Sequence, residues 1–328
     1  MSLPSWASVL IALASVAVVS LSADFLYNRL TRSPFKPAGK HCLITGGSTG
    51  LGKALAIELA KAGADVTIVA RRVPELEAAA QEIMANRKSD TQKVIHISAD
   101  VTSKEDIVRA FDEAQVKMGR NPDFMCACAG AAVPRFFLDY SLDEFERAIQ
   151  LNYLGQVYAA HQAASRMRDS GIQQGKIVFV SSMLAMLSFV GYGSYSPTKY
   201  AVRGIADTLR NELKKYNIDV HIFFPGGIES PGFDVENKTK PDITKEIEGA
   251  NTPQKPDECA QSLMKGLYAG HYMIMTDFIS EVLRCTSRGV SPTNNLVLDW
   301  CLALLGQPIA SGYALYMDYL VKTYKSAK

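Results

Sequence analysis

Residues 45–52 read Thr45-Gly46-Gly47-Ser48-Thr49-Gly50-Leu51-Gly52, a glycine-rich turn between two apolar runs. The run before it, His41–Thr45, has the length and composition of a buried strand. The run after it, Lys53–Ala62, is rich in alanine and leucine and is helical in character. Glycine allows a sharp turn close to a ligand, and a helix N-terminus offers N–H groups to a phosphate. We therefore predict a dinucleotide-binding turn with cofactor contacts from Gly46, Ser48, Thr49, Gly50, Leu51 and Gly52.

The alternation of strand and helix continues along the chain. Further strands are predicted at Asp65–Ala70, Lys93–Ser98, Asp123–Cys128, Lys176–Ser181, Asp219–Phe224 and Tyr272–Thr276. The helices between them are predicted at Pro74–Arg87, Thr102–Met118, Ser141–Arg168, 195–215 and Pro256–Tyr268. Such alternation is typical of a parallel sheet with helices on both faces. We predict an α/β protein with a doubly wound Rossmann fold over residues 40–276, in which the polar stretch 226–250 is a long functional loop.

A serine, a tyrosine and a lysine stand at a spacing that suits proton transfer. Tyr195 and Lys199 are four residues apart and share one face of the predicted helix. A lysine ammonium beside a phenol favours phenolate and lowers the phenol pKa. Ser182, after the strand Lys176–Ser181, can hold a carbonyl oxygen beside that phenol. These three residues can move a proton on or off an alcohol oxygen during hydride transfer. The alternative is that Tyr195 and Lys199 only form a solvated helix face, which has the same spacing.

The end of the second predicted strand indicates which nicotinamide cofactor is used. NAD sites place an acidic side chain there, whereas this chain has Ala70 followed by Arg71 and Arg72. Arginine pairs with a 2′-phosphate through charge-assisted hydrogen bonds. We predict NADPH, with Arg71 as the leading contact and Ser48 as a helper; the alternative is that the arginines are surface charges. Asp100-Val101, after the third strand, is placed at the adenine, although the aspartate can equally be a turn residue.

Together, the glycine turn, the spacing of Ser182, Tyr195 and Lys199, and Asn152 in LNYLG resemble the short-chain dehydrogenase/reductase family over about residues 38–276. The resemblance implies that Tyr195 donates the proton, Lys199 lowers its pKa and holds the nicotinamide ribose, and Ser182 orients the carbonyl. Asn152 would position a water that relays protons through Lys199. Further cofactor contacts are implied for Gly130, Pro225, Gly226, Ile228 and Ser230.

Two positions match the family pattern less clearly. Ser181 is an alternative serine, but only Ser182 has the spacing of the family. The family usually has an Asn-Ala-Gly run after the fourth strand, where this chain has Cys128-Ala129-Gly130. Cysteine cannot make the hydrogen bonds of an amide, so the role of Cys128 is open.

Within the family, the segments LNYLGQVY, KIVFVSS and SPGFDVENKTKP and the apolar C-terminal tail are similar to members that reduce a long-chain 3-keto sphingoid base. This similarity implies NADPH and residence on the endoplasmic reticulum membrane with the catalytic domain facing the cytosol. We expect Glu229, Asp234 and Glu236 to meet the substrate ammonium, unless they are a solvated loop face. The alternatives are reduction of a steroid, retinoid or acyl-dihydroxyacetone-phosphate ketone, or a catalytically silent nucleotide-binding membrane scaffold.

Both ends of the chain predict contact with a membrane. Residues 1–29 carry no charge before Asp24 and read as a transmembrane anchor, with a cleaved secretory signal as the alternative. Basic residues follow, which places the rest of the chain in the cytosol. Residues 30–39 read as a linker. In the extension 277–328, two apolar pieces broken at Gly306-Gln307-Pro308 predict a helical hairpin on a membrane, or else a homodimer or homotetramer interface or a cover for the core.

Composition excludes other classes of function. The chain has 328 residues with 48% apolar side chains, enough for a large core. A net charge of +2 gives no argument for nucleic-acid binding. The six cysteines lack the spacing of a metal site, so we predict no metal and a reducing compartment.

Overall fold

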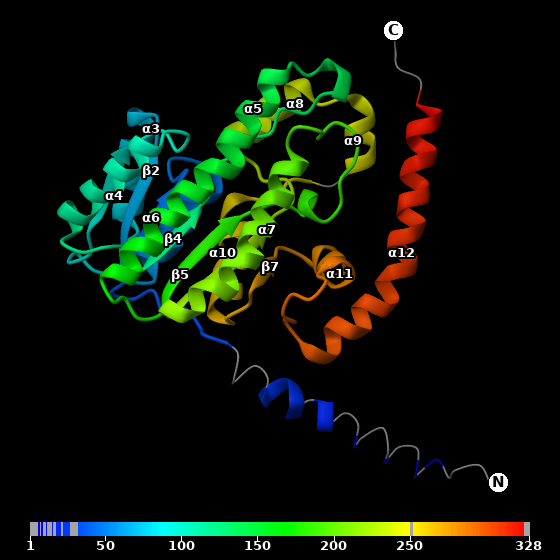
Figure 1. Ribbon diagram of the computed structural model, residues 1–328, viewed down its shortest axis with the longest axis horizontal. Helices are drawn as coiled ribbons and strands as arrows, with labels where there is room; N and C mark the ends of the chain where they lie inside the picture. The colour runs from blue at the N-terminus through cyan, green and yellow to red at the C-terminus, as the bar shows by residue number, and fades with distance from the viewer. Residues whose placement is uncertain are drawn as a thin grey trace.

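The computed structural model describes residues 32–249 and 252–324, together with residues 6, 8, 11, 15, 18–20 and 22–26. Within them, one parallel sheet has the strand order β3-β2-β1-β4-β5-β6-β7 (Figure 1). The strands are β1 (His41–Thr45), β2 (Asp65–Ala70), β3 (Val94–Ser98), β4 (Phe124–Ala127), β5 (Gly175–Val180), β6 (Ile218–Phe224) and β7 (Met273–Met275). The predicted doubly wound parallel sheet is confirmed.

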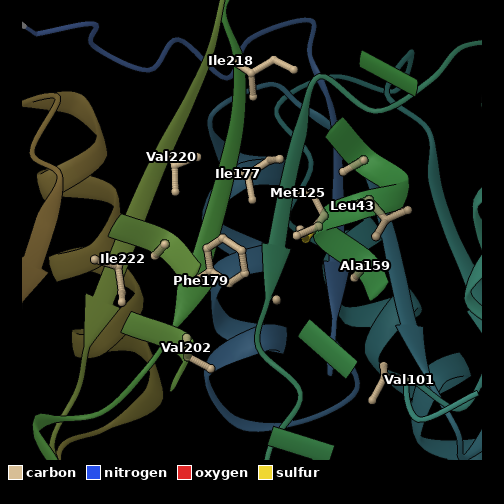
Figure 2. Packing of buried hydrophobic residues seen from close by; sticks show 14 of the residues in the cluster. Leu43, Val101, Met125, Ala159, Ile177, Phe179, Val202, Ile218, Val220 and Ile222 are labelled. Carbon is tan, nitrogen blue, oxygen red and sulfur yellow. The ribbon is translucent and has the colours of Figure 1, made fainter. Parts of the chain in front are cut away.

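Helices cover both faces of the sheet. One face packs on α2 (Gly50–Lys61), α3 (Val73–Ala85) and α10 (Pro256–Tyr268), and the other on α4 (Lys104–Met118), α6 (Gly155–Asp169) and α7 (Ser196–Glu212). Alternate residues of a strand point to opposite faces. Figure 2 shows Ile177 and Phe179 of β5 in the cluster on the α6–α7 side, whereas Val178 belongs to the cluster on the α2–α10 side. Burial on both faces explains why the strands are nearly continuous apolar runs.

The order of the sheet reverses between β1 and β4. The chain moves from β1 outward to β2 and β3, and then returns to place β4 on the other side of β1. Connections that leave two adjacent strands in opposite directions open a crevice at the carboxyl ends of those strands. The glycine turn after β1 therefore lies at the edge of a ligand crevice.

The start of one predicted helix is corrected by side-chain bonding. The helix predicted from Thr102 begins at Lys104, and Ser103 caps it by accepting a hydrogen bond from the Asp106 amide at 3.1 Å. The hydroxyl of Thr102 instead donates to Asp100 at 2.8 Å, so Thr102 belongs to the turn before the helix.

The long helix predicted at Ser141–Arg168 contains an irregular turn. It comprises α5 (Leu142–Ile149), a π-helical turn (Gln150–Leu154) and α6. Ser141 and Glu144 form a capping box at its start. A π-turn widens a helix locally and frequently marks a functional site.

The polar stretch 226–250 is not a structureless loop. It contains α8 (Pro231–Thr239) and α9 (Asp242–Glu248). Ser230 caps α8 by accepting a hydrogen bond from the Phe233 amide at 3.1 Å, and a proline occupies the first helical position. The predicted 30–39 linker is likewise packed where it is described, because Phe35 is buried and stacks on Phe124 with ring centroids 4.8 Å apart.

The C-terminal extension differs most from its prediction. It comprises α11 (Phe278–Ser287) and a single helix α12 (Leu296–Thr323) that runs through Pro308, so the predicted hairpin is wrong (Figure 1). A Cβ on Gly306 would lie 2.8 Å from Val282 and 2.7 Å from Thr286. Gly306 is therefore used for close packing of α12 on α11 and does not form a turn.

A buried ion pair fastens the same two helices. Both nitrogens of the Arg284 guanidinium fork bond to the Asp299 carboxylate, at 2.7 and 2.8 Å, and both side chains are buried. The predicted anchor at residues 1–29 lies mostly outside the described residues. Within the described parts of the chain, no helix combines the length and the apolar character needed to cross a bilayer.

Candidate active site

A cleft of about 860 Å³ opens at the carboxyl ends of the strands, and residues that follow β1 to β6 line it. Of the candidate catalytic and cofactor residues predicted from the sequence, all line this cleft except Asp100 and Asn152. The cleft thus brings together predicted residues that are up to 184 positions apart in the chain, from Gly46 to Ser230.

The glycine turn forms a cradle that side chains would fill. Gly46 has a φ of +69°, and a Cβ there would lie 2.8 Å from the Ala129 amide nitrogen. A Cβ on Gly52 would lie 2.3 Å from the Gly46 carbonyl oxygen, so α2 can begin this close to the turn only with glycine. Thr49 precedes α2 without capping it through its side chain, which leaves the first-turn N–H groups for a ligand. The turn fits the pyrophosphate of a dinucleotide.

Two arginines stand on the cleft wall beyond β2. Arg72 is paired with Glu75 at 2.8 Å, whereas the shortest pairing of Arg71 is a 3.8 Å contact with Asp100. Asp100 does not line the cleft, and its carboxylate accepts hydrogen bonds from the Thr102 backbone and hydroxyl. Asp100 is therefore a turn residue, which is one of the two alternatives that the sequence allowed. Of the two arginines, Arg71 has the weaker pairing and is the one available to a ligand.

The serine, tyrosine and lysine meet at the centre of the cleft. Tyr195 caps the start of α7, and Lys199 follows one turn later with its Nζ 5.4 Å from the centroid of the Tyr195 ring. The Ser182 side chain lies close enough to the Tyr195 phenol to act on its pKa, and its hydroxyl accepts a hydrogen bond from the Leu184 amide at 3.2 Å. Lys199 Nζ donates to the Val180 carbonyl at 3.0 Å. Ser181 is committed elsewhere, because its hydroxyl donates to the Lys199 carbonyl at 2.9 Å.

Burial is the largest influence on the pKa of both Tyr195 and Lys199. Burial and the nearby Glu236 carboxylate raise the pKa of Tyr195, and the Ser182 side chain only partly opposes them. Burial also lowers the pKa of Lys199 to about 8, with a small opposing effect of Cys128. The sequence predicted that Lys199 would lower the phenol pKa. The two groups do lie together, but burial and the Glu236 carboxylate keep the pKa of the Tyr195 phenol above that of a free tyrosine.

Asn152 supports the cleft from behind. It is fully buried in the π-helical turn, and its amide pairs with both backbone groups of Ala131, at 2.8 and 2.9 Å. A Cβ on Gly130 would lie 2.9 Å from the Asn152 side-chain oxygen and 3.4 Å from Lys199 Nζ. Asn152 thus fixes the backbone at Gly130 and Ala131, beside the catalytic lysine.

Cys128, which replaces the usual asparagine, lines the cleft directly after β4. Its amide donates to the Thr45 carbonyl at 3.1 Å and so joins the end of β4 to the glycine turn. Its thiol lies 3.4 Å from that of Cys126, and both are free cysteines. Its position in the sheet is therefore held by the backbone.

The sequence analysis did not identify three residues of the cleft wall. These are Tyr192, Glu248 and, from α12, Tyr313. Of the three acids expected to meet an ammonium, only Glu236 lines the cleft. The Glu236–Lys240 spacing of four residues is a helix signal, but the polar composition favoured a loop there.

The fold and the site define an oxidoreductase that uses a nicotinamide nucleotide. The family model for short chain dehydrogenases matches residues 40–241. The chain belongs to the short-chain dehydrogenase/reductase family, which confirms the resemblance drawn from the motifs.

Curated relatives extend the match over most of the chain. A 3-ketodihydrosphingosine reductase of Cryptococcus neoformans is 42% identical over 299 residues, covering 90% of this chain and 88% of its own. The 3-ketodihydrosphingosine reductase of Bos taurus is 34% identical over 289 residues, covering 88% and 86%. A crystal structure of a short-chain type dehydrogenase/reductase from Mycobacterium marinum has a TM-score of 0.65 at 27% identity, covering 74% of this chain and 95% of that one.

Proposed function

We propose that the protein reduces 3-ketodihydrosphingosine, a long-chain 2-amino-1-hydroxy-3-ketone, to dihydrosphingosine in sphingolipid biosynthesis, with NADPH as the reductant. The observation that carries the proposal is the meeting of Ser182, Tyr195 and Lys199 in a cleft that begins at a dinucleotide-binding turn. The relatives of that name cover about nine-tenths of the chain and support the substrate.

The chain's own residues supply the proton chemistry of the reduction. When bound, a reduced nicotinamide supplies a hydride for the carbonyl carbon. Ser182 holds the carbonyl oxygen beside Tyr195, whose phenol donates its proton to the alkoxide oxygen that forms. Lys199, still an ammonium at neutral pH, stabilises the phenolate that remains. Asn152 keeps the adjoining backbone in place through Ala131.

The choice of NADPH is supported by the end of β2. Ala70 stands where an acidic side chain would hold a ribose hydroxyl, and Arg71 lines the cleft next to it. With Arg72 engaged by Glu75, Arg71 is the guanidinium group that would pair with a 2′-phosphate, and the nearby Ser48 hydroxyl would assist.

Residence on the endoplasmic reticulum membrane, with the cleft facing the cytosol, is part of the proposal. It is supported by the apolar, uncharged N-terminal stretch and by the surface near the cleft. Ile279 and Tyr313 line the cleft, and the same two helices expose Phe278, Leu304 and Ile309. An apolar surface beside the cleft suits a substrate that enters from a lipid layer. A second copy of the chain could cover the same surface in a homodimer or homotetramer.

The test is NADPH oxidation by the detergent-solubilised full chain with a panel of lipid ketones. We expect the keto sphingoid base to be reduced faster than a steroid, a retinoid or an acyl-dihydroxyacetone-phosphate. Tyr195→Phe should abolish the reaction while NADPH still binds. Unchanged NADPH oxidation in that variant would exclude the mechanism, and binding without turnover in the wild type would favour a silent nucleotide-binding scaffold.

A further inference from the structure

A cluster of charged and hydroxyl groups forms one wall of the catalytic cleft. The Tyr192 hydroxyl donates to Glu236 at 2.6 Å and also contacts Glu248 at 2.5 Å. Lys240 Nζ lies 3.1 Å from Glu236 and 2.7 Å from Glu248. Tyr192 comes from the loop before α7, Glu236 from α8 and Glu248 from α9.

The bonding leaves one carboxylate oxygen uncommitted. Glu248 uses one oxygen for Tyr192 and the other for Lys240, whereas Glu236 uses the same oxygen, Oε1, for both. Among the residues that the structure describes, no hydrogen-bond donor reaches Glu236 Oε2. Two carboxylates against one ammonium also leave the cluster with a net negative charge, so a second cation would be attracted to that oxygen.

Lys240 is not the group that faces a ligand. It is 5% exposed and does not line the cleft, whereas Tyr192, Glu236 and Glu248 do. Its ammonium lies 4.9 Å from the centroid of the Phe233 ring and 5.8 Å from that of Tyr192. The lysine therefore holds the two carboxylates in place while it is itself shielded from the cleft.

The cluster lies next to the catalytic phenol. The ring centroids of Tyr192 and Tyr195 are 6.0 Å apart, and the Glu236 charge acts on Tyr195 strongly enough to raise its pKa. In a 2-amino-3-ketone the ammonium is carried by the carbon next to the carbonyl. A carbonyl held by Ser182 and Tyr195 would therefore bring the ammonium to this wall.

We propose that Glu236, through its Oε2, binds the ammonium group of the substrate and is the residue that selects an amino ketone over other lipid ketones. This inference rests on the proposed function and adds the group that recognises the polar head of the substrate. Glu248, Lys240 and Tyr192 are positioning residues that hold the Glu236 carboxylate. The other two acids expected from the sequence to meet the ammonium, Glu229 and Asp234, are exposed and do not line the cleft.

The experiment compares Glu236→Gln with Asp234→Asn, a matched removal of charge on the same helix. Each variant of the full chain in detergent is assayed with two ketones of equal chain length, the keto sphingoid base and its analogue without the amine. A hydrogen bond to a charged group predicts that Glu236→Gln weakens recognition of the amino ketone. Because the Glu236 charge also acts on Tyr195, a change common to both ketones is expected, and the inference is tested by their ratio: kcat/KM for the amino ketone relative to the amine-free ketone should fall about tenfold or more in Glu236→Gln, and Asp234→Asn should leave that ratio unchanged.

The amine-free ketone separates recognition from damage to the site. An equal loss on both ketones would mean that Glu236 acts on folding or on Tyr195, and would overturn the inference. No change on either ketone would overturn it as well, while the proposed function stood. If the wild type reduces the amine-free ketone but not the amino ketone, both the proposed substrate and the role of Glu236 fail.

A binding measurement tests the role of Glu236 even if the assay shows no turnover. The product amine, dihydrosphingosine, is titrated into the NADP-loaded wild type and Glu236→Gln. We expect affinity to fall about tenfold or more in the variant. Equal affinity in the two proteins would overturn the inference whatever the reaction proves to be.

Discussion

Replacing Arg71 by alanine should change which nicotinamide nucleotide the enzyme prefers. The Arg71 side chain is 68% exposed, and its contact with Asp100 is 3.8 Å long, so removing it should cost less than about 1 kcal/mol of folding stability. A hydrogen bond from a guanidinium to a phosphate contributes about 1.5–3 kcal/mol. Its loss predicts that kcat/KM with NADPH falls about tenfold to about 150-fold, whereas the value with NADH stays nearly constant.

The assay is initial-rate kinetics with both nucleotides for the wild type, Arg71→Ala and Arg72→Ala. Arg72 is the matched control, because it is one residue away on the same cleft wall but is engaged by Glu75 at 2.8 Å. We expect a smaller change in nucleotide preference from Arg72→Ala. Isothermal titration of the 2′-phosphorylated nucleotide separates binding from turnover.

Two results would refute the reasoning. A similar loss with NADPH and NADH in Arg71→Ala would show that the side chain does not read the 2′-phosphate. A larger effect of Arg72→Ala would show that the pairing with Glu75 does not decide which arginine is available. The first result would remove the support that Arg71 gives to NADPH, whereas the second would assign the 2′-phosphate contact to Arg72.

Three other perturbations test the site and its support. Burial lowers the pKa of Lys199 to about 8, so its ammonium is lost as the pH rises through that value. We expect kcat/KM for reduction to fall above about pH 8. Lys199→Arg should remove that fall, because a guanidinium stays charged. Gly52→Ala places a methyl group 2.3 Å from the Gly46 carbonyl; we expect about 1–3 kcal/mol less stability in urea unfolding and weaker nucleotide binding. Arg284→Met strands the buried Asp299 carboxylate, which should cost about 3–5 kcal/mol and loosen α12 in limited proteolysis, while Arg284→Met with Asp299→Leu should recover much of the loss.

The cofactor half of the molecule was predictable because its signals are local. A strand, a glycine turn and a helix follow one another within residues 41–61, and the requirement for Gly52 arises from the Gly46 carbonyl, six positions away. The spacing of Tyr195 and Lys199 is likewise a property of one helix. Such signals survive in a single sequence because no distant contact is needed to interpret them.

The substrate half was less predictable because its structure depends on contacts between distant segments. The helices in 231–248 have polar exposed faces, and the Tyr192–Glu236–Glu248–Lys240 cluster that joins them spans 57 positions from first to last, counting both ends. The continuity of α12 depends on Gly306 packing against α11. Glycine and proline indicate a turn in isolation, and only the partner helix shows that they serve close packing instead.

Burial acts in opposite directions on the pKa values of the two catalytic groups, and the combination suits reduction. The raised pKa of Tyr195 keeps the phenol protonated, which is the form that donates a proton. The alkoxide produced from a ketone is a far stronger base than a phenolate, so transfer remains favourable even from a weakly acidic phenol. Lys199, with a pKa of about 8, is still mostly charged at neutral pH and can stabilise the phenolate once it forms. The reverse oxidation would need the phenolate at the start, and its burial beside Glu236 opposes that state. The site thus holds on Tyr195 the proton that the reduction consumes.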